Sequence, residues 1–186
     1  MVLPIYTYGS EVLRLPAAEI EKDSVELQSL IDDMFDTMFG ASGIGLAAPQ
    51  VGRSVRLFIA DLTPLSEDLA EDGEAPPAGP MVFINPRIVE ESDEATSYEE
   101  GCLSIPEIRE DVERRAFVRV EYLDRNFEPQ VLAATGMLAR VIQHESDHLD
   151  GILFVDHISA FRRNLLRRRL REMAAGNVEA DYPLAD

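Results

Sequence analysis

The chain has 186 residues, enough for one ordinary domain, and 46% of them are hydrophobic, which is sufficient for a packed core. Its formal net charge of −18 argues against a nucleic-acid binder that uses its whole surface, because such a surface repels phosphate, so no DNA partner is expected. The single cysteine, Cys102, cannot form an internal disulfide. The first twenty residues contain no signal-peptide segment and no apolar run reaches membrane-spanning length, so we expect a soluble cytoplasmic protein without a membrane partner.

The N-terminal half predicts one helix, two short strands and a surface loop. In residues 23–39, Asp23 and Glu26 have capping-box spacing and apolar residues recur on one face, which predicts a helix. Residues 56–60 and 81–85 are short apolar runs that predict strands, the second ended by Pro86. The stretch between them, residues 63–80, is rich in Pro, Glu, Asp and Ala and predicts an acidic surface loop.

The C-terminal half predicts a strand pair and two helices. Residues 117–123 alternate in polarity and are expected to pair with residues 131–133. Residues 136–150 predict a helix that ends at Gly151. A second helix is expected over residues 159–175, with arginines on its other faces and an apolar stripe of Phe161, Leu165, Leu166, Leu170 and Met173. Strands around one central helix favour an α+β fold with mixed or antiparallel sheets and a C-terminal helix.

The pattern H-E-x-x-H, formed by His144, Glu145 and His148, lies on the predicted helix 136–150. Residues four apart in a helix project from the same face, so both imidazoles can reach one metal ion. Glu145 stands next to the first histidine, where it can reach a water molecule on that ion. The alternative is a pair of surface histidines beside an incidental glutamate. Glu145, however, falls on the apolar face, where an uncompensated carboxylate is costly.

A third metal ligand must come from another part of the chain. In the extended pattern H-E-x-x-H-x-x-G-x-x-H, Gly151 occupies the glycine position, but Phe154 stands in place of the last histidine and cannot bind a metal. We interpret His157 as a satisfied or exposed histidine. Cys102 is the remaining soft donor, although a lone cysteine can equally be a small buried hydrophobe.

Two further segments precede residues 143–149 (QHESDHL): residues 43–50 (GIGLAAPQ) and residues 99–106 (EEGCLSIP). With these three blocks in this order, the chain closely resembles the peptide deformylase family, from about Val2 through Ser159. The resemblance implies that Cys102, His144 and His148 are the metal ligands and that Glu145 is the catalytic acid/base.

The resemblance also implies roles for residues around the substrate. The side chain of Gln50 and the backbone N–H of Leu103 are expected to donate hydrogen bonds to the formyl oxygen. Residues expected around the methionine side chain and the bound peptide are Ile44, Gly45, Glu100, Gly101, Arg109, Met137 and Val141. Arg140 stands where some family members have an aliphatic residue, which predicts a more polar mouth of the pocket.

The reaction implied is metal-dependent hydrolysis of the N-formyl group from the N-terminal methionine of newly made polypeptides, with release of formate, in the bacterial cytoplasm. The family favours one Fe²⁺ ion, with Zn²⁺, Ni²⁺ or Co²⁺ able to take its place. Residues 1–160 would be the catalytic deformylase domain with the acidic insert at 63–80, residues 161–176 a basic helix, and residues 177–186 a flexible, frayed tail. Because six arginines lie between Arg162 and Arg171, ribosome contact is expected there, the alternative being an ordinary amphipathic helix packed on the core.

Two other functions remain open at this point. A metallopeptidase would cleave ordinary peptide bonds; Phe154 argues against one class of these, and release of formate separates the two activities. A metal-binding or ribosome-associated module without activity is the non-enzymatic alternative. The joint presence of Gln50, Cys102, His144, Glu145 and His148 argues against such a loss of activity.

Overall fold

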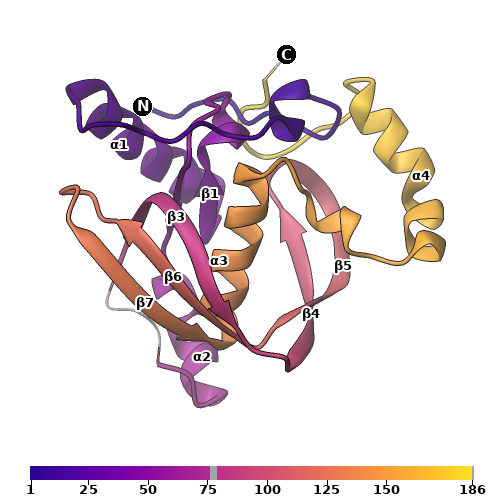
Figure 1. Ribbon diagram of the computed structural model, residues 1–186. Helices are drawn as coiled ribbons and strands as arrows, with labels where there is room; N and C mark the ends of the chain where they lie inside the picture. The colour runs from indigo at the N-terminus through magenta and orange to yellow at the C-terminus, as the bar shows by residue number, and fades with distance from the viewer. Residues whose placement is uncertain (76–78, 186) are drawn as a thin grey trace.

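Two antiparallel sheets enclose a central helix in the computed structural model, which describes residues 1–75 and 79–185 (Figure 1). One sheet has five strands in the order β1-β2-β3-β6-β7, and the other consists of β4 and β5. Helix α3 (Gly136–Leu149) lies between the two sheets and carries the H-E-x-x-H pattern (Figure 1). The α+β class with a central helix is therefore confirmed.

The five-stranded sheet contains every strand expected from the sequence. Its members are β1 (Gly45–Ala47), β2 (Leu57–Ala60), β3 (Met81–Glu91), β6 (Phe117–Leu123) and β7 (Pro129–Thr135). The prediction that Pro86 ends β3 was wrong. The register between β3 and β6 shifts between Ile84 and Arg87, so Pro86 sits at an irregularity where the ladder needs no backbone N–H from it.

The two-stranded sheet was not expected. Strand β4 (Ala95–Cys102) pairs with β5 (Ile105–Arg115), and Cys102 lies opposite Ile105, so Leu103 and Ser104 form the turn. In β5 every second residue from Ile108 is buried. Two of these buried positions are the charged residues Glu110 and Arg114, which conceal the apolar alternation that marks a strand.

Helix α1 (Val25–Gly40) confirms the first predicted helix, although its cap differs. Ser24 is the N-cap, and its side-chain oxygen accepts a hydrogen bond from the Leu27 N–H at 3.1 Å. The segment expected as a surface loop contains a 3₁₀ turn (Thr63–Leu65) and helix α2 (Ser66–Glu71). That expectation was wrong for these residues because Leu69 is buried in the core and anchors the helix.

Helix α4 (Ala160–Ala174) confirms the second predicted helix and begins at the N-cap Ser159. Only part of the expected apolar stripe is buried: Leu166, Leu170 and Met173 pack into the core, whereas Phe161 and Leu165 are 71% and 56% exposed. The helix therefore packs through one narrow face only. Further 3₁₀ turns are Glu11–Arg14, Ala48–Val51 and Phe154–Asp156. In the described part of the chain, no helix is long and apolar enough to cross a membrane.

Residues 177–185 do not form the frayed tail that the sequence predicts. Leu184 forms a parallel bridge with Ile5, so the C-terminal segment runs beside the N-terminal segment there. The Ile5 N–H donates to the Pro183 carbonyl at 2.9 Å, and the Ala185 N–H donates to the Ile5 carbonyl at 2.9 Å. Backbone pairing with a fully buried residue thus holds the tail against the domain.

Candidate metal and active site

Three soft or borderline donors converge where the two sheets meet α3. The helix supplies His144 and His148, one turn apart, and the end of β4 supplies Cys102. One ligand atom from each of these residues lies within 4.8 Å of the others, and Sγ of Cys102 is 3.3 Å from Nε2 of His148. A thiolate with two imidazoles is a donor set that zinc and ferrous iron accept. Burial lowers the pKa of His148 well below its ordinary value, which favours the neutral form that a metal requires.

Glu100 orients the first histidine. Its Oε1 lies 2.8 Å from Nδ1 of His144, which leaves Nε2 of that ring for a metal ion. Arg114 and Arg140 each reach Oε2 of Glu100 at 2.6 Å. Burial alone would raise the pKa of Glu100, but the hydrogen bonds from His144 and Arg114 lower it to about 2. The carboxylate is therefore ionised at neutral pH, and Arg114 extends the network to Asp147 at 2.8 Å.

Arg140 belongs to this network and is not a free polar group at the mouth of the pocket. Its side chain is 7% exposed, and its guanidinium also donates to the carbonyl oxygens of Val112 at 2.9 Å and Thr96 at 2.7 Å. Arg140 does line the cleft, but its guanidinium is already hydrogen-bonded, so a more polar pocket mouth stays a prediction. A guanidinium taken out of water needs a carboxylate and carbonyl oxygens around it, and Glu100 and the β4–β5 hairpin supply them.

Glu145 is a buried carboxyl group with an unused oxygen. It is 5% exposed, and its Oε2 has no hydrogen-bond partner among the described residues. Burial raises the pKa of Glu145 to about 7. An unpartnered buried carboxyl oxygen is costly unless it serves a ligand. Its place beside the three donors therefore fits a site that holds a metal ion and a water molecule.

Gln50 and Leu103 were expected to donate hydrogen bonds to the formyl oxygen. Both residues lie next to Cys102. Gln50 comes from the 3₁₀ turn after β1, and its Oε1 accepts from the Ala47 N–H at 2.8 Å. That bond turns Nε2 of Gln50 towards Sγ of Cys102 at 3.4 Å and Oγ of Ser104 at 3.1 Å. Leu103 directly follows the cysteine in the β4–β5 turn.

These groups open into one cleft of about 850 Å³. All of the site residues expected from the sequence except the buried His148 line this cleft: Ile44, Gly45, Gln50, Glu100, Gly101, Cys102, Leu103, Arg109, Met137, Val141, His144 and Glu145. Arg109 is at the exposed rim, where it pairs with Glu99 at 2.8 Å. The sequence did not reveal that residues 179–182 also line the cleft, because no local pattern links the tail to the hairpin.

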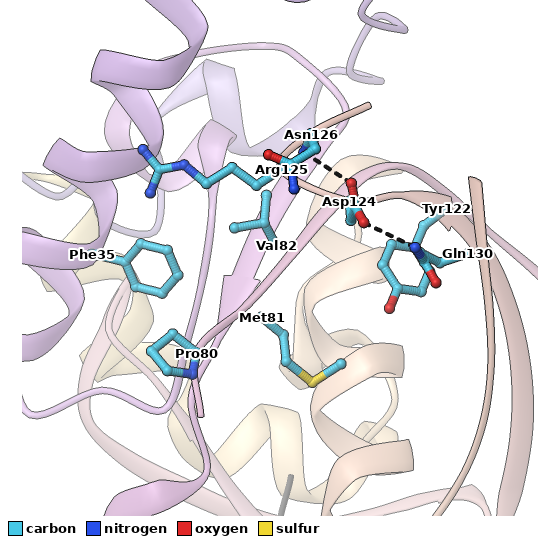
Figure 2. Close-up of a pocket in the computed structure, with 9 residues that line it drawn as sticks. All are labelled: Phe35, Pro80, Met81, Val82, Tyr122, Asp124, Arg125, Asn126 and Gln130. Carbon is cyan, nitrogen blue, oxygen red and sulfur yellow. Dashed lines mark hydrogen bonds between the residues drawn. The ribbon is translucent and has the colours of Figure 1, made fainter. Parts of the chain in front are cut away.

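A second hollow of about 460 Å³ lies beside α1 (Figure 2). Phe35 of α1 and Met81 and Val82 of β3 lie on one side, and Tyr122 and Asp124 on the other. Asp124 accepts hydrogen bonds from the Asn126 N–H and the Gln130 side chain at 2.9 Å, so its charge closes the β6–β7 turn. None of the expected site residues lines this hollow, so the chemistry belongs to the larger cleft.

The chain is similar in sequence and fold to several peptide deformylases. The family model for polypeptide deformylase matches residues 2–164. A peptide deformylase of Salinibacter ruber is 60% identical over 184 residues, which cover 99% of this chain and 94% of the relative. One of Christiangramia forsetii is 46% identical over 188 residues, covering 99% of this chain and 95% of the relative.

Solved structures agree with the sequence relatives. A peptide deformylase from Ehrlichia chaffeensis superimposes with a TM-score of 0.85 at 37% identity, over 95% of this chain and 99% of that one. One from Legionella pneumophila gives a TM-score of 0.81 at 39% identity, over 94% of this chain and 96% of that one. The chain therefore belongs to the polypeptide deformylase family, metal-dependent enzymes that remove the N-formyl group from nascent peptides.

Proposed function

We propose that this deformylase holds one divalent metal ion on Cys102, His144 and His148 and hydrolyses N-formylmethionyl peptides with Glu145 as general acid/base. The observation that carries the proposal is the buried, unpartnered Oε2 of Glu145 beside three convergent metal donors. A bound ion would polarise the formyl group and activate water as a nucleophile.

Glu145 moves the proton in this scheme. With its pKa raised to about 7 by burial, the carboxyl group can both accept and release a proton near neutral pH. It takes a proton from the attacking water, whose oxygen forms the new bond to the formyl carbon. It then gives that proton to the nitrogen of methionine as the C–N bond breaks, which yields formate and a free amino terminus.

The cleft supplies the groups that hold the substrate. The side-chain amide of Gln50 and the Leu103 N–H donate to the formyl oxygen, where negative charge develops. Residues that surround the methionine side chain and the peptide are Ile44, Gly45, Gly101, Arg109, Met137 and Val141. Glu100 acts differently, because its carboxylate is engaged by His144, Arg114 and Arg140 and so positions a metal ligand.

Replacing Glu145 with Gln tests the proton-transfer role. The three metal donors remain, so metal stoichiometry should stay at the wild-type value. The rate of formate release should fall by about 100-fold to 10,000-fold. Formate is measured directly with a short formyl-Met peptide, and N-formylmethionine is measured in parallel. Near-normal formate release from metal-loaded Glu145→Gln would refute the role, and release of N-formylmethionine without formate from the wild type would identify a metallopeptidase.

We propose Fe²⁺ as the resident ion, with Zn²⁺, Ni²⁺ or Co²⁺ as substitutes. One thiolate and two imidazoles do not decide among these ions, and the family resemblance favours iron. Both Fe²⁺ and the thiolate of Cys102 can be oxidised, so activity should decay in air and persist under anaerobic preparation. Iron-free protein that has full specific activity after anaerobic purification would contradict this choice.

We also propose that residues 1–160 are the catalytic domain and that α4 contacts ribosomal RNA in the bacterial cytoplasm. Four arginines of α4 contact the protein itself: Arg162 with Glu110, Arg163 with Val155, Arg168 with Glu172 and Arg169 with Glu107. Within the described residues, Arg167 and Arg171 have no such partner and are exposed. Among the arginines of α4, Arg167 and Arg171 are therefore the ones whose charges can bind phosphate groups of ribosomal RNA.

A further inference from the structure

We infer that the C-terminal tail, residues 177–185, completes the active site of the catalytic domain proposed for residues 1–160, and that Tyr182 is a positioning residue for the Leu103–Ser104 turn. The inference rests on the role proposed for Leu103 in binding the formyl oxygen. The family model ends at residue 164, so the tail lies outside the region that defines the family.

Tyr182 makes a direct hydrogen bond to the turn. Its hydroxyl donates to the carbonyl oxygen of Leu103 at 2.8 Å. Only one Cα atom separates that carbonyl from the Leu103 N–H, so fixing the carbonyl limits how far the N–H can rotate. Burial raises the pKa of Tyr182 to about 12, which keeps the phenol protonated and able to donate.

The rest of the tail makes this contact stable. Pro183 and Ala185 bond to the backbone of Ile5 on either side of the Leu184 bridge, each at 2.9 Å. Ile5 is fully buried, so the strand-like pairing is fixed to the core and not to a mobile surface. The backbone hydrogen bond to Pro183, which directly follows Tyr182, thus fixes the position of Tyr182.

The N-terminal segment that receives the tail also contacts the active site. Next to Ile5, the Tyr6 N–H donates to the carbonyl of Gln50 at 2.8 Å, and the Tyr8 N–H donates to the carbonyl of Ser104 at 2.8 Å. Both proposed donors to the formyl oxygen are therefore held through backbone contacts that continue to the tail. Loosening the tail should affect the transition state more than the unreacted substrate, because negative charge grows on that oxygen during the reaction.

The tail also forms one wall of the cleft, through Glu179, Ala180, Asp181 and Tyr182. The ring of Tyr182 would remain in a Tyr182→Phe variant, so this wall is kept while the hydrogen bond to Leu103 is removed. Tyr122→Phe is the matched control, since Tyr122 lies at the second hollow and not in the catalytic cleft.

Four quantities should be compared among wild type, Tyr182→Phe and Tyr122→Phe: kcat, KM, metal content and amide hydrogen exchange. For Tyr182→Phe we expect kcat to fall by about threefold to tenfold, the range for losing one neutral hydrogen bond, with KM and metal content unchanged. The amides of Leu103 and Ser104 should exchange faster than in wild type. Tyr122→Phe should leave all four quantities at their wild-type values.

Wild-type kcat and unchanged exchange in Tyr182→Phe would overturn the inference. A rise in KM alone would also overturn it, because the tail would then act only as a wall for the peptide. The exchange measurement does not need turnover. Absence of formate release from the wild type would therefore refute the proposed function, while the exchange data would still report whether Tyr182 holds the turn.

Discussion

Gly45 in β1 packs so closely against the carboxyl group of Glu145 that any added side-chain atom would force that group to shift. A methyl group at residue 45 would lie 3.0 Å from Cδ of Glu145 and closer still to Oε1. Gly45→Ala should therefore displace the carboxyl group while leaving the metal donors in place. We expect normal metal content and a fall in kcat on the order of 100-fold, the effect of a displacement of about 1 Å.

Gly40→Ala provides the matched control for this substitution. Gly40 also lines the cleft, but an added methyl group would meet only Val2, at 3.9 Å. Its kcat should equal that of the wild type. If Gly45→Ala has the kcat of Gly40→Ala, the position of Glu145 does not depend on β1.

The histidine part of the metal site was predictable because its two residues are close in sequence. His144 and His148 need only the helical repeat to share a face, and that spacing is visible in the chain. The hairpin that delivers Cys102 was not predictable, because Glu110 and Arg114 occupy inward positions of β5. They are tolerated there since Arg114 pairs with Glu100 and Glu110 pairs with Arg162, partners that no local pattern reveals.

Contacts between distant residues explain the remaining differences. Tyr182 and Leu103 are 79 residues apart, and the hydrogen bond between them depends on the tail returning to Ile5. The polarity pattern of α4 likewise shows that Phe161 and Leu165 are apolar, but not that both side chains stay exposed. Periodicity predicts which residues share a face, whereas burial depends on what lies opposite.

Cys102→Ala should greatly weaken metal binding, because it removes both a bond and the charge of the thiolate. Metal content after dialysis should fall well below one ion per chain, and formate release should fall with it. Ser146→Ala is the control: Ser146 lies between the two histidines on α3, and its buried Oγ has no partner among the described residues. Stoichiometric, tightly held metal in Cys102→Ala would mean that another residue is the third ligand.

Asp156 should contribute stability that depends on pH. Burial opposes ionisation of this carboxyl group, but hydrogen bonds from Arg14 and the Leu153 N–H lower its pKa below the ordinary value. A carboxyl whose pKa is lower in the folded state stabilises that state above its unfolded pKa of about 3.9, and the contribution disappears as pH falls through the folded value. Asp156→Asn should therefore lose roughly 0.5–1 kcal/mol at pH 7, since the pair is partly exposed.

Urea unfolding of wild type and Asp156→Asn at pH 7 and at pH 3 measures this effect. The difference in unfolding free energy should be largest at pH 7 and should shrink at pH 3. Asp93→Asn, whose side chain is exposed and makes no hydrogen bond to a described residue, should show no difference at either pH. An Asp156→Asn deficit that is the same at both pH values would show that the charge of Asp156 is not its source.

Ribosome contact through α4 predicts a charge dependence at two residues. Arg167→Glu combined with Arg171→Glu should weaken co-sedimentation with ribosomes at low salt, because these are the arginines of α4 without a side-chain partner among the described residues. Wild-type binding should weaken as salt rises, since binding to phosphate releases counterions. Leu166, Leu170 and Met173 keep the helix packed in the variant, so hydrolysis of a short formyl peptide should be unchanged.

The control variant is Lys22→Glu combined with Arg53→Glu, which changes the net charge equally at two exposed residues outside α4. If α4 binds ribosomal RNA, this control should co-sediment more strongly than the α4 variant at the same salt concentration. Equal weakening in both variants would attribute the loss of binding to overall charge. This alternative needs a control because the protein already has a net charge of −18. No weakening in the α4 variant would leave α4 with a structural role alone, in which its arginines pair with Glu110, Glu107 and Glu172 around the buried apolar face.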